Sequence, residues 1–94
     1  MRERAIETRL RRQVEKAGGL APKWTGWAGA PDRILLFPGG RVAFVETKAP
    51  GGRPRPLQQK RHDDLRALGF QVFVLDSPEA VDTFVREALN AGLG

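Results

Sequence analysis

The chain has 94 residues and a formal net charge of +5, with 40% hydrophobic and 29% charged residues. This balance is typical of one folded domain over residues 1–94 and excludes a disordered tail. The absence of cysteine and the presence of one histidine exclude disulfide scaffolds, thiol chemistry and cysteine-ligated zinc, and make a multi-histidine or Ser-His-Asp mechanism hard to build.

Apolar spacing and turn residues predict the elements in chain order. They are a helix over 3–17, a strand or an irregular extended piece over 20–27, strands over 33–37 and 41–48, a helix over 57–68, a strand over 71–75 and a helix over 78–90. Pro38-Gly39-Gly40 is typical of a hairpin turn, and Ser77 of a helix N-cap.

The segment between the strand over 41–48 and the strand over 71–75 is long enough for a parallel crossover through the intervening helix. The strand over 41–48 carries apolar residues on both faces, with Val42 and Phe44 on one and Ala43 and Val45 on the other. We therefore expect an α/β fold, a mixed sheet with helices on both faces.

Two charged residues end the strand predicted over 41–48. Glu46 and Lys48 are two residues apart, so both side chains project from the face that carries Val42 and Phe44. One interpretation is a surface ion pair at a strand edge. The other is an active site, in which Glu46 binds a metal and Lys48 orients or polarises an attacking water.

Asp32 directly precedes the strand over 33–37. If that strand pairs with the next one around the Pro38-Gly39-Gly40 turn, Asp32 and Glu46 arrive side by side. Two carboxylates at such a separation repel one another unless a cation lies between them. Mg²⁺ binds one or two carboxylates together with water and phosphate oxygens, so the pattern indicates a metal site suited to phosphodiester hydrolysis.

Twelve of the 16 basic residues are arginines, whose planar guanidinium binds phosphate through paired hydrogen bonds. A nucleic acid is therefore the expected partner. Candidate phosphate contacts near the presumed site in sequence are Lys23, Arg33, Arg53, Arg55, Lys60 and Arg61. Each is also an ordinary solvated charge when taken singly, and the Pro/Gly-rich loop favours Arg53 and Arg55.

Pro31-Asp32 followed by Glu46-Thr47-Lys48 resembles the PD-(D/E)xK nuclease signature. The surrounding string is more specific, because it adds Gly29-Ala30 before the first motif, Ala49-Pro50-Gly51-Gly52 after the second, and then Pro56-Leu57-Gln58. From Glu3 to about Ser77, the chain resembles the VRR-NUC (virus-type replication-repair nuclease) family, specifically its stand-alone phage-type members.

The resemblance implies a restriction-endonuclease-like fold, a mixed β-sheet flanked by helices in αβββαβα-type order. It implies that Asp32 and Glu46 bind Mg²⁺ or Mn²⁺, with the Thr47 carbonyl as a third ligand. It also makes Lys48 the catalytic lysine and places Gln58, at the start of the second helix, facing the site.

A first-helix glutamate completes the expected catalytic set. On a helical wheel, Glu3 falls inside the apolar stripe of Ile6, Leu10 and Val14, so we expect it to face the core. It is then either a partner of the helix dipole or a functional group, and Glu7, at the stripe's edge, is the alternative. The spacing of Glu3, Ile6 and Leu10 resembles a pattern of archaeal-type junction resolvases, which favours Glu3.

Three other residues have two interpretations each. Trp24 and Trp27, where the chain departs from the family pattern, could stack on unpaired bases, although core or dimer contacts are favoured. His62 has no acidic neighbour in sequence apart from Asp63 and Asp64, so we interpret it as a surface histidine and not a ligand.

The family implies a metal-dependent, structure-specific DNA endonuclease, with a homodimeric Holliday-junction resolvase as the first hypothesis. A nickase or flap nuclease, a catalytically silent DNA-binding accessory protein, and a basic interaction protein without a nucleic-acid role are the alternatives. No small-molecule cofactor is expected. No apolar run reaches the roughly 20 residues that span a bilayer, and residues 1–12 lack the apolar stretch of a secretion signal. We therefore expect no membrane association and a cytoplasmic protein of a phage or prophage in a bacterial host.

Overall fold

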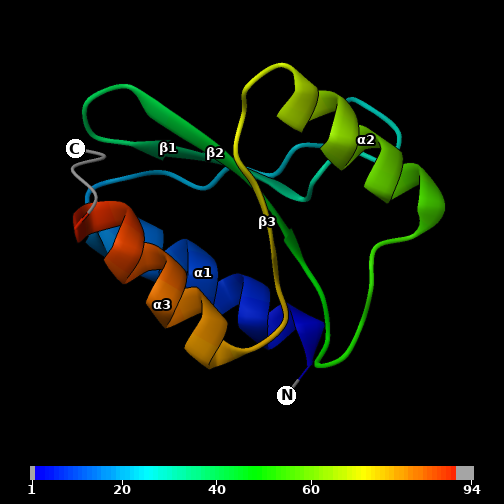
Figure 1. Cartoon of the computed structure of the whole chain (residues 1–94). Helices are drawn as coiled ribbons and strands as arrows, with labels where there is room; N and C mark the ends of the chain where they lie inside the picture. The colour runs from blue at the N-terminus through cyan, green and yellow to red at the C-terminus, as the bar shows by residue number, and fades with distance from the viewer. Residues whose placement is uncertain (1, 91–94) are drawn as a thin grey trace.

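The structure is a computed structural model that describes residues 2–90. Its elements in chain order are α1 (Glu3–Lys16), β1 (Arg33–Phe37), β2 (Arg41–Thr47), α2 (Pro56–Ala67), β3 (Val72–Leu75) and α3 (Pro78–Asn90). In Figure 1 the sheet runs diagonally, with α1 and α3 side by side on one face and α2 on the other. Among the described residues no helix has the length and apolar character needed to cross a membrane.

The three strands form one sheet in the order β1-β2-β3. β1 and β2 are antiparallel, with Ile34 opposite Phe44 and Phe37 opposite Arg41. The turn between them contains Gly39 and Gly40, whose φ angles of +87° and +78° are in the left-handed region that glycine adopts without strain. β2 and β3 are parallel. The predicted hairpin, parallel crossover and mixed sheet with helices on both faces are confirmed.

Of the two alternatives for residues 20–27, the irregular extended piece is confirmed and the strand is wrong. Within the described residues this segment makes only isolated bridges, from Leu20 to Leu36 and from Lys23 to Arg33. The order of helices and strands is therefore αββαβα, and not the αβββαβα type that the resemblance implies. The chain leaves the sheet after Lys23 and loops back at Gly29, whose φ is +79°. A Cβ at Gly29 would lie 2.7 Å from Cγ of Leu57, so this loop packs directly on the start of α2.

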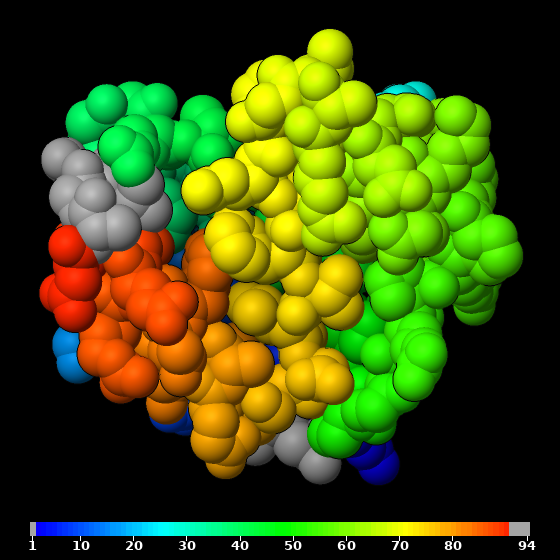
Figure 2. Space-filling view, in the orientation of Figure 1, coloured from blue at the N-terminus to red at the C-terminus, as the bar shows by residue number. Residues whose placement is uncertain are grey.

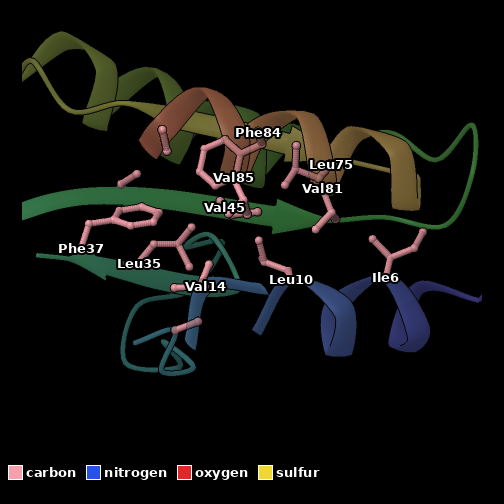
Figure 3. Close-up of a cluster of buried hydrophobic side chains, with 13 residues drawn as sticks. Ile6, Leu10, Val14, Leu35, Phe37, Val45, Leu75, Val81, Phe84 and Val85 are labelled. Atoms are coloured by element: carbon pink, nitrogen blue, oxygen red, sulfur yellow. The ribbon is translucent and has the colours of Figure 1, made fainter. Parts of the chain in front are cut away.

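The larger core lies between the sheet and the α1–α3 layer. Ile6, Leu10 and Val14 of α1 are fully buried, as the helical spacing predicts. They meet Val45 of β2 and Val81 of α3 in the cluster drawn in Figure 3. Ser77 caps α3 by accepting a hydrogen bond from the Ala80 N–H at 3.0 Å. This packing covers one face of β2.

The smaller core lies under α2 and consists of Phe44, Leu65 and Val72. Trp24 and Trp27 pack against it, with the Trp24 ring 5.3 Å from Phe44 and 5.8 Å from Trp27. The core interpretation of the two tryptophans is therefore confirmed. In Figure 2 the atoms of β3 (gold) lie at the surface between α2 (yellow-green) and α3 (orange), because β3 is an edge strand of the sheet.

Candidate active site

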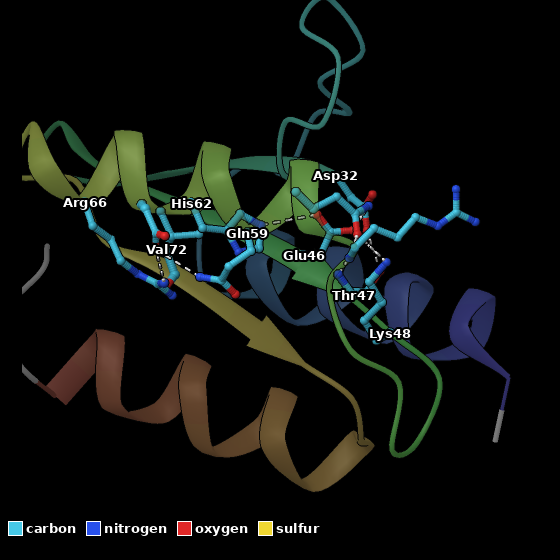
Figure 4. A network of polar contacts seen from close by, with 11 residues as sticks. Asp32, Glu46, Thr47, Lys48, Gln59, His62, Arg66 and Val72 are labelled. Atoms are coloured by element: carbon cyan, nitrogen blue, oxygen red, sulfur yellow. Dashed lines mark hydrogen bonds and ion pairs between the residues drawn. The ribbon is translucent and has the colours of Figure 1, made fainter.

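The strand register brings Asp32 and Glu46 together. Arg33 pairs with Val45, so the preceding Asp32 lies beside Glu46 where β2 approaches its end. Asp32 Oδ2 accepts hydrogen bonds from the main-chain N–H of Thr47 at 3.0 Å and from its hydroxyl at 3.1 Å. Figure 4 shows Asp32, Glu46, Thr47 and Lys48 gathered at this point. The register expected from the hairpin thus accounts for the meeting of the two carboxylates.

Glu46 is buried, with 1% of its surface exposed. Burial, followed by the charge of Asp32, raises the pKa of Glu46 to about 7, and the nearby ammonium of Lys48 opposes this rise. The surface ion-pair interpretation of Glu46 and Lys48 is therefore wrong. A buried carboxylate beside a second acidic residue is a site where a bound cation is favoured.

Gln58 joins the two charged residues of β2. Its Nε2 donates to Glu46 Oε2 at 3.2 Å, and its Oε1 accepts from Lys48 Nζ at 3.0 Å. The same oxygen accepts from the Arg55 N–H at 2.8 Å, which ties the side chain to the beginning of α2. Lys48 Nζ lies 3.4 Å from Glu46 Oε2. Gln58 faces the site, as the resemblance implies, and holds both partners in place.

His62 is buried next to Glu46, contrary to the surface position expected from the sequence. Its imidazole has no exposed surface, and Nε2 lies 3.5 Å from Glu46 Oε1. Burial, then Arg66, lowers the pKa of His62. The sequence carried a signal for this position: His62 is four residues after Gln58 and three before Leu65, so all three share one helix face. Figure 4 shows His62 on α2 above the strands.

Glu3 and Glu7 both differ from expectation. Glu3 is exposed, so the prediction that it faces the core is wrong; the core begins one turn later, at Ile6, and α1 starts beyond its edge. Its role at the site stays a prediction. Glu7 is half-buried and forms an ion pair with Arg33, in which its Oε1 lies 2.8 Å from Nη2. Its carboxylate is therefore paired with Arg33 and not with the residues around Glu46.

The basic candidates divide into two groups. Lys23, Arg53, Arg55 and Lys60 are exposed and available to a polyanion. Arg33 is not, because its side chain is buried between Glu7 and the main-chain oxygen of Ala21, to which Nη1 donates at 2.7 Å. The expectation that Arg33 contacts DNA is corrected accordingly. Arg61 lies over the Trp27 ring at 4.5 Å and donates a hydrogen bond to the Ala28 carbonyl. These contacts hold the loop that contains Trp27 and Ala28 against α2.

The donors at this point fit a hard divalent cation. In the described part of the chain no three or more His, Cys, Asp or Glu side chains group as metal ligands, so Asp32 and Glu46 form a two-carboxylate set. Both hydrogen bonds to Asp32 reach Oδ2, and Glu46 Oε1 is buried without a hydrogen-bond partner. Two carboxylates completed by a main-chain oxygen and water suit Mg²⁺ or Mn²⁺ better than zinc.

The raised pKa of Glu46 predicts how the stability of the metal-free protein varies with pH. Between pH 4.5 and about 7 the folded protein keeps a proton that the unfolded chain has lost, so the free energy of unfolding falls as pH rises through this window. Above this window the free energy of unfolding has fallen by about 3 kcal/mol in total. His62 acts oppositely, because its lowered pKa costs stability below pH 6.5.

Urea unfolding in chelator tests this for the wild type and for Glu46→Gln at about pH 5 and about pH 8. We expect the wild-type stability relative to Glu46→Gln to decrease by about 2.5 kcal/mol between the two pH values. A constant difference would show that Glu46 titrates normally.

Three comparisons relate the chain to known proteins. The family model of the VRR-NUC domain matches residues 2–79. A protein named "Putative nuclease p44", from Acyrthosiphon pisum secondary endosymbiont phage 1, is 48% identical over 81 residues, which cover 84% of this chain and 87% of that protein. A solved structure titled "VRR_NUC domain" is 33% identical and superposes with a TM-score of 0.84 over 89% of this chain and 94% of its own.

Proposed function

The chain belongs to the VRR-NUC domain family of nucleases, and on that premise we propose that it is a metal-dependent, structure-specific DNA endonuclease acting as a homodimeric Holliday-junction resolvase. The observation that carries this proposal is the buried Glu46 beside Asp32, with Lys48 Nζ 3.4 Å from Glu46 Oε2. Carboxylates and an ammonium held together at adjacent strand ends are the groups that phosphodiester hydrolysis requires.

Each residue has a distinct task in this proposal. Asp32 and Glu46 hold Mg²⁺ or Mn²⁺, with the Thr47 carbonyl as a third ligand. When bound, the metal lowers the pKa of the attacking water and offsets charge on the scissile phosphate. Lys48 orients that water or stabilises the charge that develops on the phosphate. Gln58 keeps the Lys48 ammonium in reach by accepting its hydrogen bond.

The dimer and the branched substrate are supported by the chemistry of resolution. Resolving a four-way junction takes two opposed cuts, and each chain supplies one such site. Two copies related by a two-fold axis would present two equivalent sites to the two strands. Sedimentation of the protein bound to a synthetic junction tests this: we expect two protein chains per junction, and one chain per junction would contradict the dimer.

End-labelled DNA substrates test the activity. The protein is incubated with a four-way junction, a flap, a linear duplex and a single strand, in Mg²⁺, in Mn²⁺ and in chelator. We expect paired, symmetric cuts in the junction alone, and none in chelator. Cuts in the flap or the duplex would keep the nuclease and remove the junction preference. Tight binding without any cut would make the chain a DNA-binding accessory protein.

The exposed loop between β2 and α2 is the expected phosphate contact. Replacing Arg53 and Arg55 together with serine should reduce the slope of log K against log salt by about 2, because each arginine that contacts phosphate releases about one counterion. The matched control replaces Arg41 and Arg86, which are exposed elsewhere. Equal slopes for both double variants would show a nonspecific charge effect.

The proposed cellular location rests on the similarity to a phage protein. The relative at 48% identity is a phage protein, which supports a phage or prophage nuclease that works on DNA in the bacterial cytoplasm. No small-molecule cofactor enters this proposal, since carboxylates, lysine and metal suffice for the reaction.

A further inference from the structure

His62 is buried against the site but has no part in the mechanism above. Among the described side chains, Glu46 Oε1 and both ring nitrogens of His62 are buried and without a hydrogen-bond partner. Two of these atoms face each other, with His62 Nε2 3.5 Å from Glu46 Oε1. Three such atoms gathered at one point need an explanation, because buried polar groups in folded proteins are nearly always paired.

We propose that His62 is the positioning residue of Glu46: its neutral imidazole donates Nε2–H to Glu46 Oε1 and holds the carboxylate toward Asp32. This inference rests on the proposed metal-dependent nuclease function. A neutral imidazole has one N–H donor and one acceptor nitrogen, and an ionised carboxylate can only accept. The tautomer with the proton on Nε2 is therefore the one that satisfies Glu46.

The other oxygen of Glu46 shows why this contact matters. Oε2 accepts from Gln58 and lies near Lys48, so one side of the carboxylate is already oriented from α2. Gln58 and His62 are four residues apart on that helix and lie on the same face. Gln58 contacts Oε2 of Glu46, and His62 lies beside Oε1. The present separation of 3.5 Å exceeds an N–H···O hydrogen bond by about 0.5 Å. A shift of that size would complete the second contact, and the two contacts together would fix the rotation and the tilt of the carboxylate.

The chain contains one histidine, so its ring nitrogens give unambiguous NMR signals. Long-range ¹H–¹⁵N spectra of the metal-free protein, above the pH at which Glu46 ionises, identify the tautomer. We expect a proton on Nε2 and none on Nδ1. A proton on Nδ1 in place of Nε2 would overturn the proposal, because Nε2 could then donate nothing to Glu46. This readout needs neither cleavage nor a variant.

Variants separate positioning from packing. His62→Phe keeps the bulk and removes the donor, whereas His62→Gln keeps an N–H. The control, Leu65→Val, loosens the same helix face without touching Glu46. For His62→Phe we expect a loss of about 10- to 100-fold in Mn²⁺ affinity, measured by calorimetry, and in kcat, with KM for DNA unchanged.

We expect His62→Gln to recover most of both quantities and Leu65→Val to match the wild type. Wild-type Mn²⁺ affinity and kcat in folded His62→Phe would overturn the proposal, as would a loss of equal size in Leu65→Val. If the wild type itself cuts no DNA, the nuclease proposal fails, while the tautomer and the Mn²⁺ affinity still decide the role of His62.

Discussion

Replacing Lys48 with alanine is expected to lower the single-turnover rate of DNA cleavage by about 10²- to 10⁴-fold. The Lys48 ammonium is held by Gln58 and lies beside Glu46, and in the proposed mechanism it acts on the water or the phosphate rather than binding DNA at large. Only 16% of its side chain is exposed. Affinity for DNA, measured in chelator by a shift of fluorescence anisotropy, should therefore stay close to that of the wild type.

The matched control for this variant is Lys16→Ala. Lys16 is exposed in the last turn of α1, so the change removes the same charge away from the site and should leave the rate unchanged. Cleavage by Lys48→Ala at the wild-type rate would contradict the role of Lys48. A parallel loss of DNA affinity and rate would assign it to binding instead.

The second large effect is expected from removing either carboxylate. Asp32→Asn and Glu46→Gln should each weaken Mn²⁺ binding by at least about tenfold and lower the cleavage rate by about 10³-fold or more, because a neutral amide is a poor ligand for a hard cation. Calorimetry with Mn²⁺ and single-turnover cleavage measure the two quantities. Asp63→Asn, an exposed acid on α2, is the control and should change neither.

Glu46→Gln carries a second signature that a general loss of structure would not produce. Because burial raises the pKa of Glu46 to about 7, the wild-type protein above that pH keeps a charge in a poorly solvated position when no metal is bound. The variant should therefore be more stable than the wild type in chelator while it is inactive in Mg²⁺. A variant that is both inactive and less stable would indicate that Glu46 serves folding.

The hairpin and the meeting of Asp32 with Glu46 could be predicted from sequence because both depend on local rules. The Pro38-Gly39-Gly40 turn sets the register of β1 against β2, and the period of two along a strand places Glu46 on the face of Phe44. These rules act over a few residues and leave few alternatives. The same period explains why Glu46 is buried: the face it shares with Phe44 is covered by α2.

The failures concern contacts between segments far apart in sequence. The contact between His62 and Glu46 depends on how α2 packs on β2, which the sequence does not indicate. The four-residue spacing from Gln58 indicates only that the two side chains share one face of α2. Arg33 is buried because Glu7 of α1 offers it a partner. Glu3 is in register with the apolar stripe but lies beyond its end, so the helical wheel gives its direction and not its surroundings.

Anomalous diffraction from crystals grown with Mn²⁺ tests most directly the claim that Asp32 and Glu46 hold a divalent cation. The account predicts an anomalous peak between the two carboxylates, with the Thr47 carbonyl oxygen as a further ligand and no such peak in Glu46→Gln crystals. Peaks confined to surface carboxylates, with nothing between Asp32 and Glu46, would contradict it.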